Sequence, residues 1–483
     1  MYTSLSSRQF GNKVNMHLMN LRKRSQKTVC FLFLLFFLGI CPQAMSRADS
    51  SEFSVLQKSI IDYNLKAYEQ SIADGTYRGE AGIMNIGPEV ALSLGIKAFI
   101  NDDYLNGVNQ EKQADLFFSK AVSAMAPEEN GSTKEEQTKK IGTFSNNHNF
   151  AFKSARDFFL KYKQNLATNP DERWNKAISL GAMEKLLKKS FQETSYNLRE
   201  GLGRYYNFCK GLPENTPALT PENIRFVNSL FNQFTKKAPK SVRKRFDLDT
   251  QSEKIEANWE TYRKLGERDA RSPYMKLLTP LFEKQKKRHY PTDPLLFMAL
   301  MRRESNFNPQ AVSYVGAAGL TQIMPETGIG LGMKTIYDPD YFDQAMNLLR
   351  LDRKARHTAI SIIPEINERN MMEKAALARD WMQQSTEYKK KSSALFARYR
   401  EELLKSGKDD RLDAAKSIAF GYRYFSKMME KNKGDISLAL ASYNAGPHRV
   451  NQYDGIPPYN ETVTFRNKVL SFYREYLQEL KAR

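Results

Sequence analysis

The sequence has few of the residues on which several common chemistries depend. Of its three cysteines, Cys30 and Cys41 lie within the first 48 residues, so a chain that lacks this segment keeps only Cys209 and forms no internal disulfide. The five histidines show no metal-ligand spacing and no H-E-x-x-H motif, and no G-x-S-x-G elbow is present. Metal-dependent hydrolysis and serine acyl transfer therefore lose their support.

The apolar run at residues 29–41 is short for a membrane span, which needs about 20 residues. Basic residues precede this run, and Ser46, Arg47 and Ala48 after it offer a small-x-small cleavage site. We therefore expect residues 1–48 to be a secretory signal peptide, cleaved near Ala48, and the protein to be exported to the periplasm or cell envelope. An uncleaved membrane anchor is the alternative.

Glu304 stands at the end of an apolar helical pattern. Asp293 and Pro294 are typical of the N-cap and first position of a helix, and apolar residues stand three, four and seven positions before Glu304. Desolvation on that apolar stripe and the negative end of the helix dipole both raise the pKa of the carboxyl group, which suits a general acid. For an isolated glutamate, a surface residue that caps the next turn is the alternative.

Glu304 also opens a regularly spaced motif. The motif continues with Ser305, Ser313, Gly316, Ala317, Gly319, Leu320, Gln322, Met324 and Pro325. This stretch resembles the signature of the SLT family of lytic transglycosylases at the family's spacing, although Thr321 stands where many members have methionine. The glycine-rich segment lacks the Lys-Ser/Thr ending of a phosphate-binding loop, which excludes a nucleotide site of that kind.

Two further blocks of the same family follow in the family's order. The block at 434–447 reads as a short helix with Asp435 as its N-cap and with Tyr443 and Asn444 in its last turn. The third block surrounds Glu461. From the residues alone, Tyr443 is a core aromatic residue and Asn444 a C-cap; the resemblance implies that the tyrosine lies close to the catalytic glutamate and orients it.

The resemblance assigns Glu304 and Tyr443 to catalysis. It assigns five more residues to substrate binding or to shaping the site: Ser313, Gln322, Met324, Asn444 and Glu461. Of these, the loop residues Ser313, Gln322 and Met324 are expected to face the sugar or the acid. The family's reaction needs one acid, so no metal and no cofactor are expected.

The implied activity is that of a peptidoglycan lytic transglycosylase. Neutral Glu304 would protonate the β-1,4 glycosidic oxygen between N-acetylmuramic acid and N-acetylglucosamine, and a 1,6-anhydro ring would form on the muramic acid. Two alternatives stay open. One is a lysozyme-like hydrolase in which Glu461, Glu326 or Asp338 activates water. The other is a non-catalytic protein that binds the cell wall.

The patterns of the whole chain indicate an all-α protein. We expect a helical N-terminal region of unknown role at 49–272 and a lysozyme-like SLT catalytic domain at 273–483. A compact SLT domain does not need the residues at about 343–412. We therefore predict that this segment is a helical insertion. No internal repeat of dependable period is found, so a helical-repeat scaffold stays only an open alternative.

Acidic residues are too few to balance the basic ones. The formal net charge is +20, and removal of the seven basic residues in 1–48 leaves +13. This excess predicts an anionic partner, and the carboxylates of peptidoglycan, other wall polymers or membrane lipids suit an exported protein. Nucleic acid is the rival polyanion, but no nucleic-acid module is recognisable. The oligomeric state cannot be derived.

Overall fold

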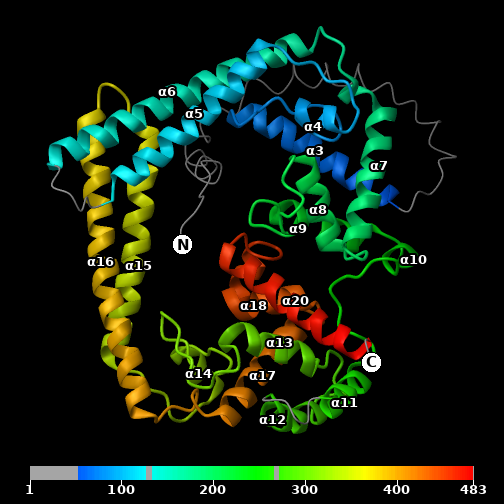
Figure 1. Ribbon diagram of the computed structural model, residues 1–483, viewed down its shortest axis with the longest axis vertical. Coiled ribbons are helices and arrows are strands. Elements are labelled where there is room, and N and C mark those ends of the chain that lie inside the picture. The colour runs from blue at the N-terminus through cyan, green and yellow to red at the C-terminus, as the bar shows by residue number, and fades with distance from the viewer. Residues whose placement is uncertain (1–52, 127–132, 266–270, 482–483) are drawn as a thin grey trace, which may run out of the picture. The chain divides into compact units, whose positions relative to one another are not determined.

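The computed structural model describes residues 53–126, 133–265 and 271–481, and within these ranges the chain is helical with no β-strand (Figure 1). The predicted all-α class is therefore confirmed. No helix of these ranges has the length and apolar character that crossing a membrane requires. The predicted signal peptide, residues 1–48, lies outside the described residues.

The chain packs as two compact units. The first takes in residues up to Glu184 together with Leu351–Tyr388, and the second consists of Lys185–Arg350 and Lys389–Arg483. The bounds predicted from the sequence for the N-terminal region, the catalytic domain and the insertion stay predictions. The helical character expected for the insertion is present, because α15 and α16 occupy most of that segment.

The first unit is built largely from long helices. Its elements, some of which continue into the second unit, are α3 (Ser54–Asp74), α4 (Pro88–Ser93), α5 (Asp102–Ala124), α6 (Lys134–Leu166), η3 (Glu172–Trp174), α7 (Lys176–Glu193), α15 (Asp340–Ser361), η4 (Ile363–Glu365) and α16 (Met371–Ser406). Helix α6 starts with a capping box, in which Thr133 and Glu136 exchange side-chain and backbone hydrogen bonds. Aromatic residues of α5 and α6, among them Tyr104, Phe159 and Tyr162, pack into one core.

Apolar residues at the adjoining ends of two helix pairs form a joint cluster in the first unit, here named the tip cluster. Helices α5 and α6 contribute Phe118, Ala121, Met125 and Ile141, while α15, η4, α16 and their connections contribute Ala359, Ile360, Ile362, Ile363, Ile366, Ala375, Ala378 and Met382. Asn149 of α6 fastens the two pairs, since its amide donates to the carbonyl oxygens of Ile363 at 2.9 Å and Ile366 at 2.7 Å.

The second unit contains the motif that begins at Glu304. Its remaining helices are α8 (Leu198–Cys209), α9 (Ile224–Lys237), α10 (Lys240–Arg243), α11 (Ile255–Leu265), α12 (Ser272–Glu283), α13 (Pro294–Ser305), α14 (Pro325–Leu331), α17 (Ala414–Lys431), α18 (Ile436–Ala445), α19 (Pro447–Gln452) and α20 (Asn460–Lys481). Helix α13 is apolar around its whole circumference, and every residue from 294 to 301 is buried. A helix of that character belongs in the middle of a core.

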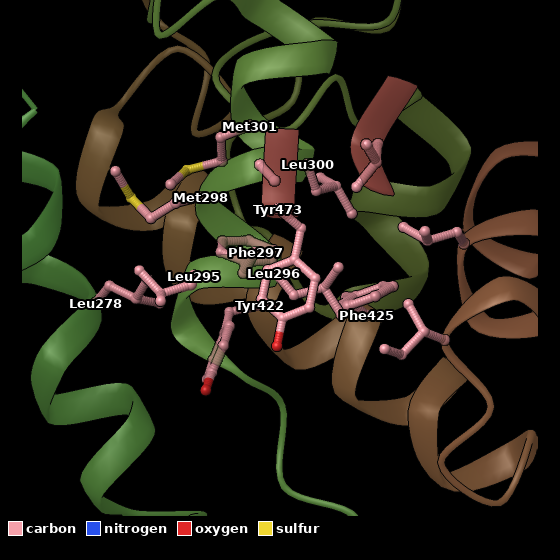
Figure 2. Packing of buried hydrophobic residues seen from close by; sticks show 14 of the residues in the cluster. Leu278, Leu295, Leu296, Phe297, Met298, Leu300, Met301, Tyr422, Phe425 and Tyr473 are labelled. Atoms are coloured by element: carbon pink, nitrogen blue, oxygen red, sulfur yellow. The ribbon is translucent and has the colours of Figure 1, made fainter. Parts of the chain in front are cut away.

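Side chains from other helices surround α13, as Figure 2 shows for Tyr422, Phe425 and Tyr473. The ring of Phe297 meets that of Tyr422 edge to face, with centroids 5.0 Å apart. Tyr473 also donates a hydrogen bond to the carboxylate of Asp293 at the start of α13. The helix is therefore fixed along its length, which fixes the residues at its C-terminal end.

Buried ion pairs join α8 to α18 and α20 within the second unit. The Arg199 guanidinium lies 2.7 Å from Asp249 and 2.6 Å from Asp435, and Arg466 lies 3.1 Å from Asp249 and 2.8 Å from Glu200. Burial by itself would raise the pKa of Asp249, but Arg466 and Arg199 outweigh it and lower that pKa below its ordinary value. The network is well paired, so removal of one member would leave an uncompensated buried charge.

Candidate active site

The acid predicted from the sequence lies in the last turn of α13. The predicted N-cap is confirmed: the Asp293 carboxylate accepts from the Leu295 N–H at 2.8 Å, and Pro294 is the first helical residue. At the other end Asn306, with φ 50°, adopts the left-handed conformation that ends the helix. Glu304 is therefore carried on a helix whose two ends and core are all fixed.

Burial raises the pKa of Glu304 to about 8, and the negative charge of Glu461 adds to this, while Arg303 opposes it. Among the described residues, no hydrogen bond or ion pair involves the Glu304 carboxyl group. A carboxyl group in this state is protonated at neutral pH and can give its proton to a bound ligand. These are the properties that a general acid needs.

Tyr443 lies beside Glu304, and the structure thereby brings together the two residues assigned to catalysis. Burial raises the pKa of the Tyr443 phenol well above its ordinary value, and the charge of Glu304 contributes to the shift. The phenol donates to the backbone carbonyl of Thr321 at 2.7 Å, while its ring packs against Tyr424 and Phe425. Tyr443 therefore links α18 to the loop that follows the acid.

This loop is also fastened to α13 itself. The hydroxyl group of Ser305 donates to the Leu320 carbonyl at 2.9 Å, and the buried Thr321 hydroxyl bonds to Ser417 of α17 at 3.1 Å. Neither contact was predicted from the sequence, although Ser305 belongs to the recognised motif and Thr321 lies within its span. For Thr321 the sequence did offer a sign of this contact, because a hydroxyl residue stands there in place of the family's usual methionine.

The three loop residues predicted to bind substrate make contacts mostly within their own loop. The Ser313 hydroxyl accepts from the Ala317 N–H at 2.9 Å. The Gln322 amide donates to the carbonyls of Ala311 and Gly319, at 3.0 and 2.9 Å. Met324 is the N-cap residue of α14, and its side chain packs on a neighbouring apolar cluster. These contacts hold the loop in shape, and a direct role toward the sugar stays a prediction.

A buried arginine that sequence reasoning missed supports the loop. Arg411 lies between α16 and α17, donates to the carbonyls of Gly316 and Ile323 at 3.1 and 3.3 Å, and pairs with Asp409 at 2.7 Å. Gly319, at φ 80°, passes so close that a Cβ atom there would lie 1.7 Å from the Arg411 carbonyl oxygen. This contact explains why the motif requires glycine at position 319. The charged run at 409–411 reads in the sequence as an exposed loop.

The remaining predicted residues lie on α18 and α20. The amide oxygen of Asn444 accepts from the Thr462 hydroxyl at 2.8 Å, and Glu461 is exposed in the first turn of α20. Of the three carboxylates considered as water-activating bases, only that of Glu461 acts on Glu304; Glu326 and Asp338 are exposed and do not. In the described ranges, no three or more His, Cys, Asp or Glu side chains are grouped to hold a metal ion.

We expect Tyr443→Phe to slow turnover about tenfold while the fold is kept. The substitution removes the hydrogen bond to Thr321 and the polar group beside the acid, and one such bond is worth about 1–1.5 kcal/mol. Initial rates on isolated peptidoglycan, the substrate that the family resemblance implies, check this alongside thermal melting. If the folded variant has the wild-type rate, the catalytic role assigned to Tyr443 is contradicted. Tyr424→Phe, which changes the neighbouring ring, is the matched control.

A family model described as the transglycosylase SLT domain matches residues 281–349 and 388–462. Both segments lie mainly in the second unit, and together they include every residue assigned above to catalysis or substrate binding. The intervening 350–387, which carries the ends of α15 and α16 and the η4 turn, is left out of the match. It lies inside the insertion predicted at about 343–412.

Short stretches of the chain are similar to curated proteins. It is 46% identical over 50 residues to a transglycosylase of Enterobacteria phage PRD1, which covers 10% of this chain and 19% of that protein. It is 50% identical over 48 residues to the membrane-bound lytic murein transglycosylase C of Actinobacillus pleuropneumoniae serotype 5b, which covers 10% and 13%. The matched stretches thus span less than a fifth of these relatives.

An X-ray structure of an inactive mutant of lytic transglycosylase Slt from Pseudomonas aeruginosa aligns over 95% of this chain and 77% of that one, at 14% identity and a TM-score of 0.25. The similarity to lytic transglycosylases is carried instead by the family match and by the motif around Glu304. Through its segments 281–349 and 388–462, the chain matches the transglycosylase SLT domain.

Proposed function

We propose that the protein is a lytic transglycosylase that cleaves the β-1,4 bond between N-acetylmuramic acid and N-acetylglucosamine in peptidoglycan and leaves a 1,6-anhydro end. The observation that carries this proposal is Glu304, an acid with a pKa near 8 and no bonding partner among the described residues, at the start of the SLT motif. The relatives named above are transglycosylases, which favours the same reaction.

In the proposed reaction the neutral Glu304 gives its proton to the glycosidic oxygen as the bond to the muramic acid C1 breaks. The carboxylate that remains then takes the proton of the C6 hydroxyl group of the same sugar, and the C6 oxygen bonds to C1. The acid returns to its starting state and no water is consumed. A nucleophile held within the substrate can have a very high effective concentration, so one carboxyl group suffices.

Hydrolysis is the second candidate, because Glu461 places a second carboxylate close enough to act on Glu304. Two carboxylates are the usual equipment of hydrolytic glycosidases, in which the second one activates water or forms a covalent intermediate. Glu461 belongs to a family block of its own, however, and its charge has a simpler use, which is to keep Glu304 protonated.

Peptidoglycan strands are the proposed substrate and the cell envelope the proposed location. One relative is described as a membrane-bound lytic murein transglycosylase, and the predicted export signal and the net charge of +13 that remains after residues 1–48 suit an anionic wall. The deciding experiment is to incubate the purified protein with isolated sacculi and identify the released sugars by mass spectrometry. Anhydro ends support the proposal, reducing ends favour the hydrolase, and no release contradicts both.

The pH profile should report the titration of Glu304. Because the acid must be protonated to act, we expect kcat to fall as the pH rises through about 8. The Glu461 charge raises the pKa of Glu304, so Glu461→Gln should move this limb to lower pH, whatever its effect on the rate. Glu326→Gln, which alters an exposed carboxylate of α14, should leave the limb in place. An unchanged limb in Glu461→Gln would contradict the prediction.

A further inference from the structure

Residues 77–95 of the first unit are similar to residues 314–332 of the second, which contain the SLT loop. Nine of these nineteen positions hold the same residue as the position 237 further on. They are Tyr77, Gly79, Ala81, Gly82, Ile86, Pro88, Glu89, Leu94 and Gly95, which match Tyr314, Gly316, Ala318, Gly319, Ile323, Pro325, Glu326, Leu331 and Gly332.

The two stretches fold in the same way. An antiparallel bridge joins Ala81 to Ile86, and another joins Ala318 to Ile323. The residue before each of these isoleucines, Asn85 in one stretch and its counterpart at 322 in the other, has a positive φ, of 51° and 46°. A short helix then starts at the equivalent proline, α4 in the first case and α14 in the second.

Each loop is also held by its own buried arginine. Arg173 donates to the carbonyls of Gly79 and Ile86 at 2.8 and 3.0 Å and to the Tyr162 phenol at 2.7 Å. Arg411 makes the three equivalent bonds, with Tyr399 in place of Tyr162. These arginines and tyrosines are 238 and 237 residues apart.

The close approach at glycine recurs as well. A Cβ atom at Gly82 would lie 1.9 Å from the Arg173 carbonyl oxygen, just as one at Gly319 would lie 1.7 Å from that of Arg411. The aspartates two residues before these arginines also make equivalent bonds. The Phe99 N–H donates to Asp171 at 2.9 Å, and the N–H of residue 337 donates to Asp409 at 2.8 Å.

The order of helices extends the correspondence over most of the chain. Helices α4, α5, α6, α7 and α8 begin 237 or 238 residues before α14, α15, α16, α17 and α18, respectively. In α3 the buried positions 53, 56, 59, 60 and 64 match the buried positions 294, 297, 300, 301 and 305 at a spacing of 241. The conclusion that no dependable repeat exists is therefore wrong. The fold is thus present twice. The copy in the N-terminal region is here named the first copy, and the one that carries Glu304 the second copy.

The first copy lacks the acid. At the spacing of 241, Tyr63 takes the place of Glu304, and Asn64 takes that of Ser305. The bonding agrees with this register, since the Asn64 amide donates to the carbonyls of Ile83 and Met84, the counterparts of residues 320 and 321. The neighbouring carboxylate on α3, that of Asp62, is exposed. A phenol titrates near pH 10 and is a poor proton donor at neutral pH, so the first copy is not equipped to cleave.

We propose that the first copy binds a glycan strand of the same class without cleaving it. The copy that carries Glu304 recognises glycan in the proposed function, and the first copy keeps its loop, its buried arginine and its order of helices. At the position of the acid the first copy has an aromatic residue, Tyr63. This proposal rests on the proposed function of the second copy.

The exposed ring of Trp174 supplies the contact surface in the first copy, and Tyr68 and the buried Tyr77 pack behind it. Tyr68 of α3 lies edge-on to Tyr77 at 5.8 Å and to Trp174 at 6.1 Å. Trp174 directly follows the loop-holding Arg173 and is 51% exposed, although a ring of this size is normally buried. Sugar rings present apolar faces, and an exposed indole with one polar group is suited to receive them.

The test compares retention on insoluble sacculi by sedimentation, in a Glu304→Gln background that prevents cleavage. Adding Trp174→Ala should weaken retention about threefold to tenfold, as expected for the loss of one aromatic contact. Trp174→Phe should restore most of it. Phe150→Ala removes another ring of the first copy, 72% exposed on α6, and should have no effect.

Equal retention of the Glu304→Gln protein with and without Trp174→Ala, when both melt alike, would overturn the inference. An equal loss with Phe150→Ala would overturn it too, because the effect would then not be specific to the site. Release of anhydro ends by the wild-type protein is scored separately. Absence of that release contradicts the proposed function, whereas the comparison of retention decides the inference.

Discussion

The Glu304→Gln variant should release about 1,000-fold less sugar from sacculi than the wild-type protein. Glutamine keeps the size and polarity of the side chain but has no proton to give, and a positioned general acid contributes on the order of 10²–10⁴ to a rate. Mass spectrometry of the released ends measures the loss. Substantial turnover by a folded Glu304→Gln protein would refute Glu304 as the acid.

The same variant should be at least as stable as the wild-type protein at pH 7. The pKa of Glu304 is raised from an ordinary 4.5 to about 8, so the unfolded chain loses this proton above pH 4.5 while the folded chain keeps it. Stability therefore falls as the pH rises between these values, and glutamine escapes this loss. Thermal melting of the two proteins at pH 7 checks the sign of this difference in stability. It also distinguishes a loss of catalysis from a loss of folding. Glu326→Gln serves as the control, with activity retained.

Arg411→Met should lower the free energy of unfolding by about 3–5 kcal/mol and abolish activity with it. The substitution leaves Asp409 buried without its partner and removes two donors from the loop that carries the SLT motif. Denaturant unfolding measures the loss. The matched control is Arg288→Met, which breaks a pair between two exposed side chains, Arg288 and Glu430, and should cost about 0–1 kcal/mol. Similar losses in the two variants would contradict the assigned role of Arg411.

The elements of the site that depend on local pattern could be predicted from the sequence. Asp293 and Pro294 mark the start of α13 in the chain as they do in the structure, and the apolar stripe before Glu304 already indicates a desolvated acid. These features follow from helix periodicity and capping, which act over a few residues. For the same reason the helical class of the whole chain could be predicted.

The features that depend on distant contacts could not be predicted. Nothing local marks Arg411 as buried, because the run of charges at 409–411 also fits a solvated loop. The bond from Tyr443 to the Thr321 carbonyl joins residues 122 apart, and its acceptor is a backbone atom that has no sequence signature. Ser313 and Gln322 were expected to face substrate from family likeness, which says little about the bonds they make within their loop.

The duplication was missed because its period is about half the chain and the identities concentrate in one loop. Conserved geometry shows it better than conserved residues do: Tyr104 and Phe342 differ, yet each packs on an equivalent tyrosine, Tyr162 and Tyr399, with centroids 5.1 and 4.6 Å apart. A helix of one copy is also longer. Helix α3 has 21 residues and α13 has 12, and the change of spacing from 241 to 237 falls in the segment between residue 64 and Tyr77 that includes the longer end of α3.

The tip cluster has a consequence for symmetry. Ala121 and Ala359 both belong to it, as do Met125 and Ile363, and each pair is separated by the repeat distance of 238. Equivalent positions of the repeat thus pack together within the first unit, as equivalent residues do across an isologous interface. The helices that the SLT family model leaves out at 350–387 therefore have their packing partner within the same chain. A duplicated chain makes internally, with no concentration dependence, a contact that separate protomers would have to make by association.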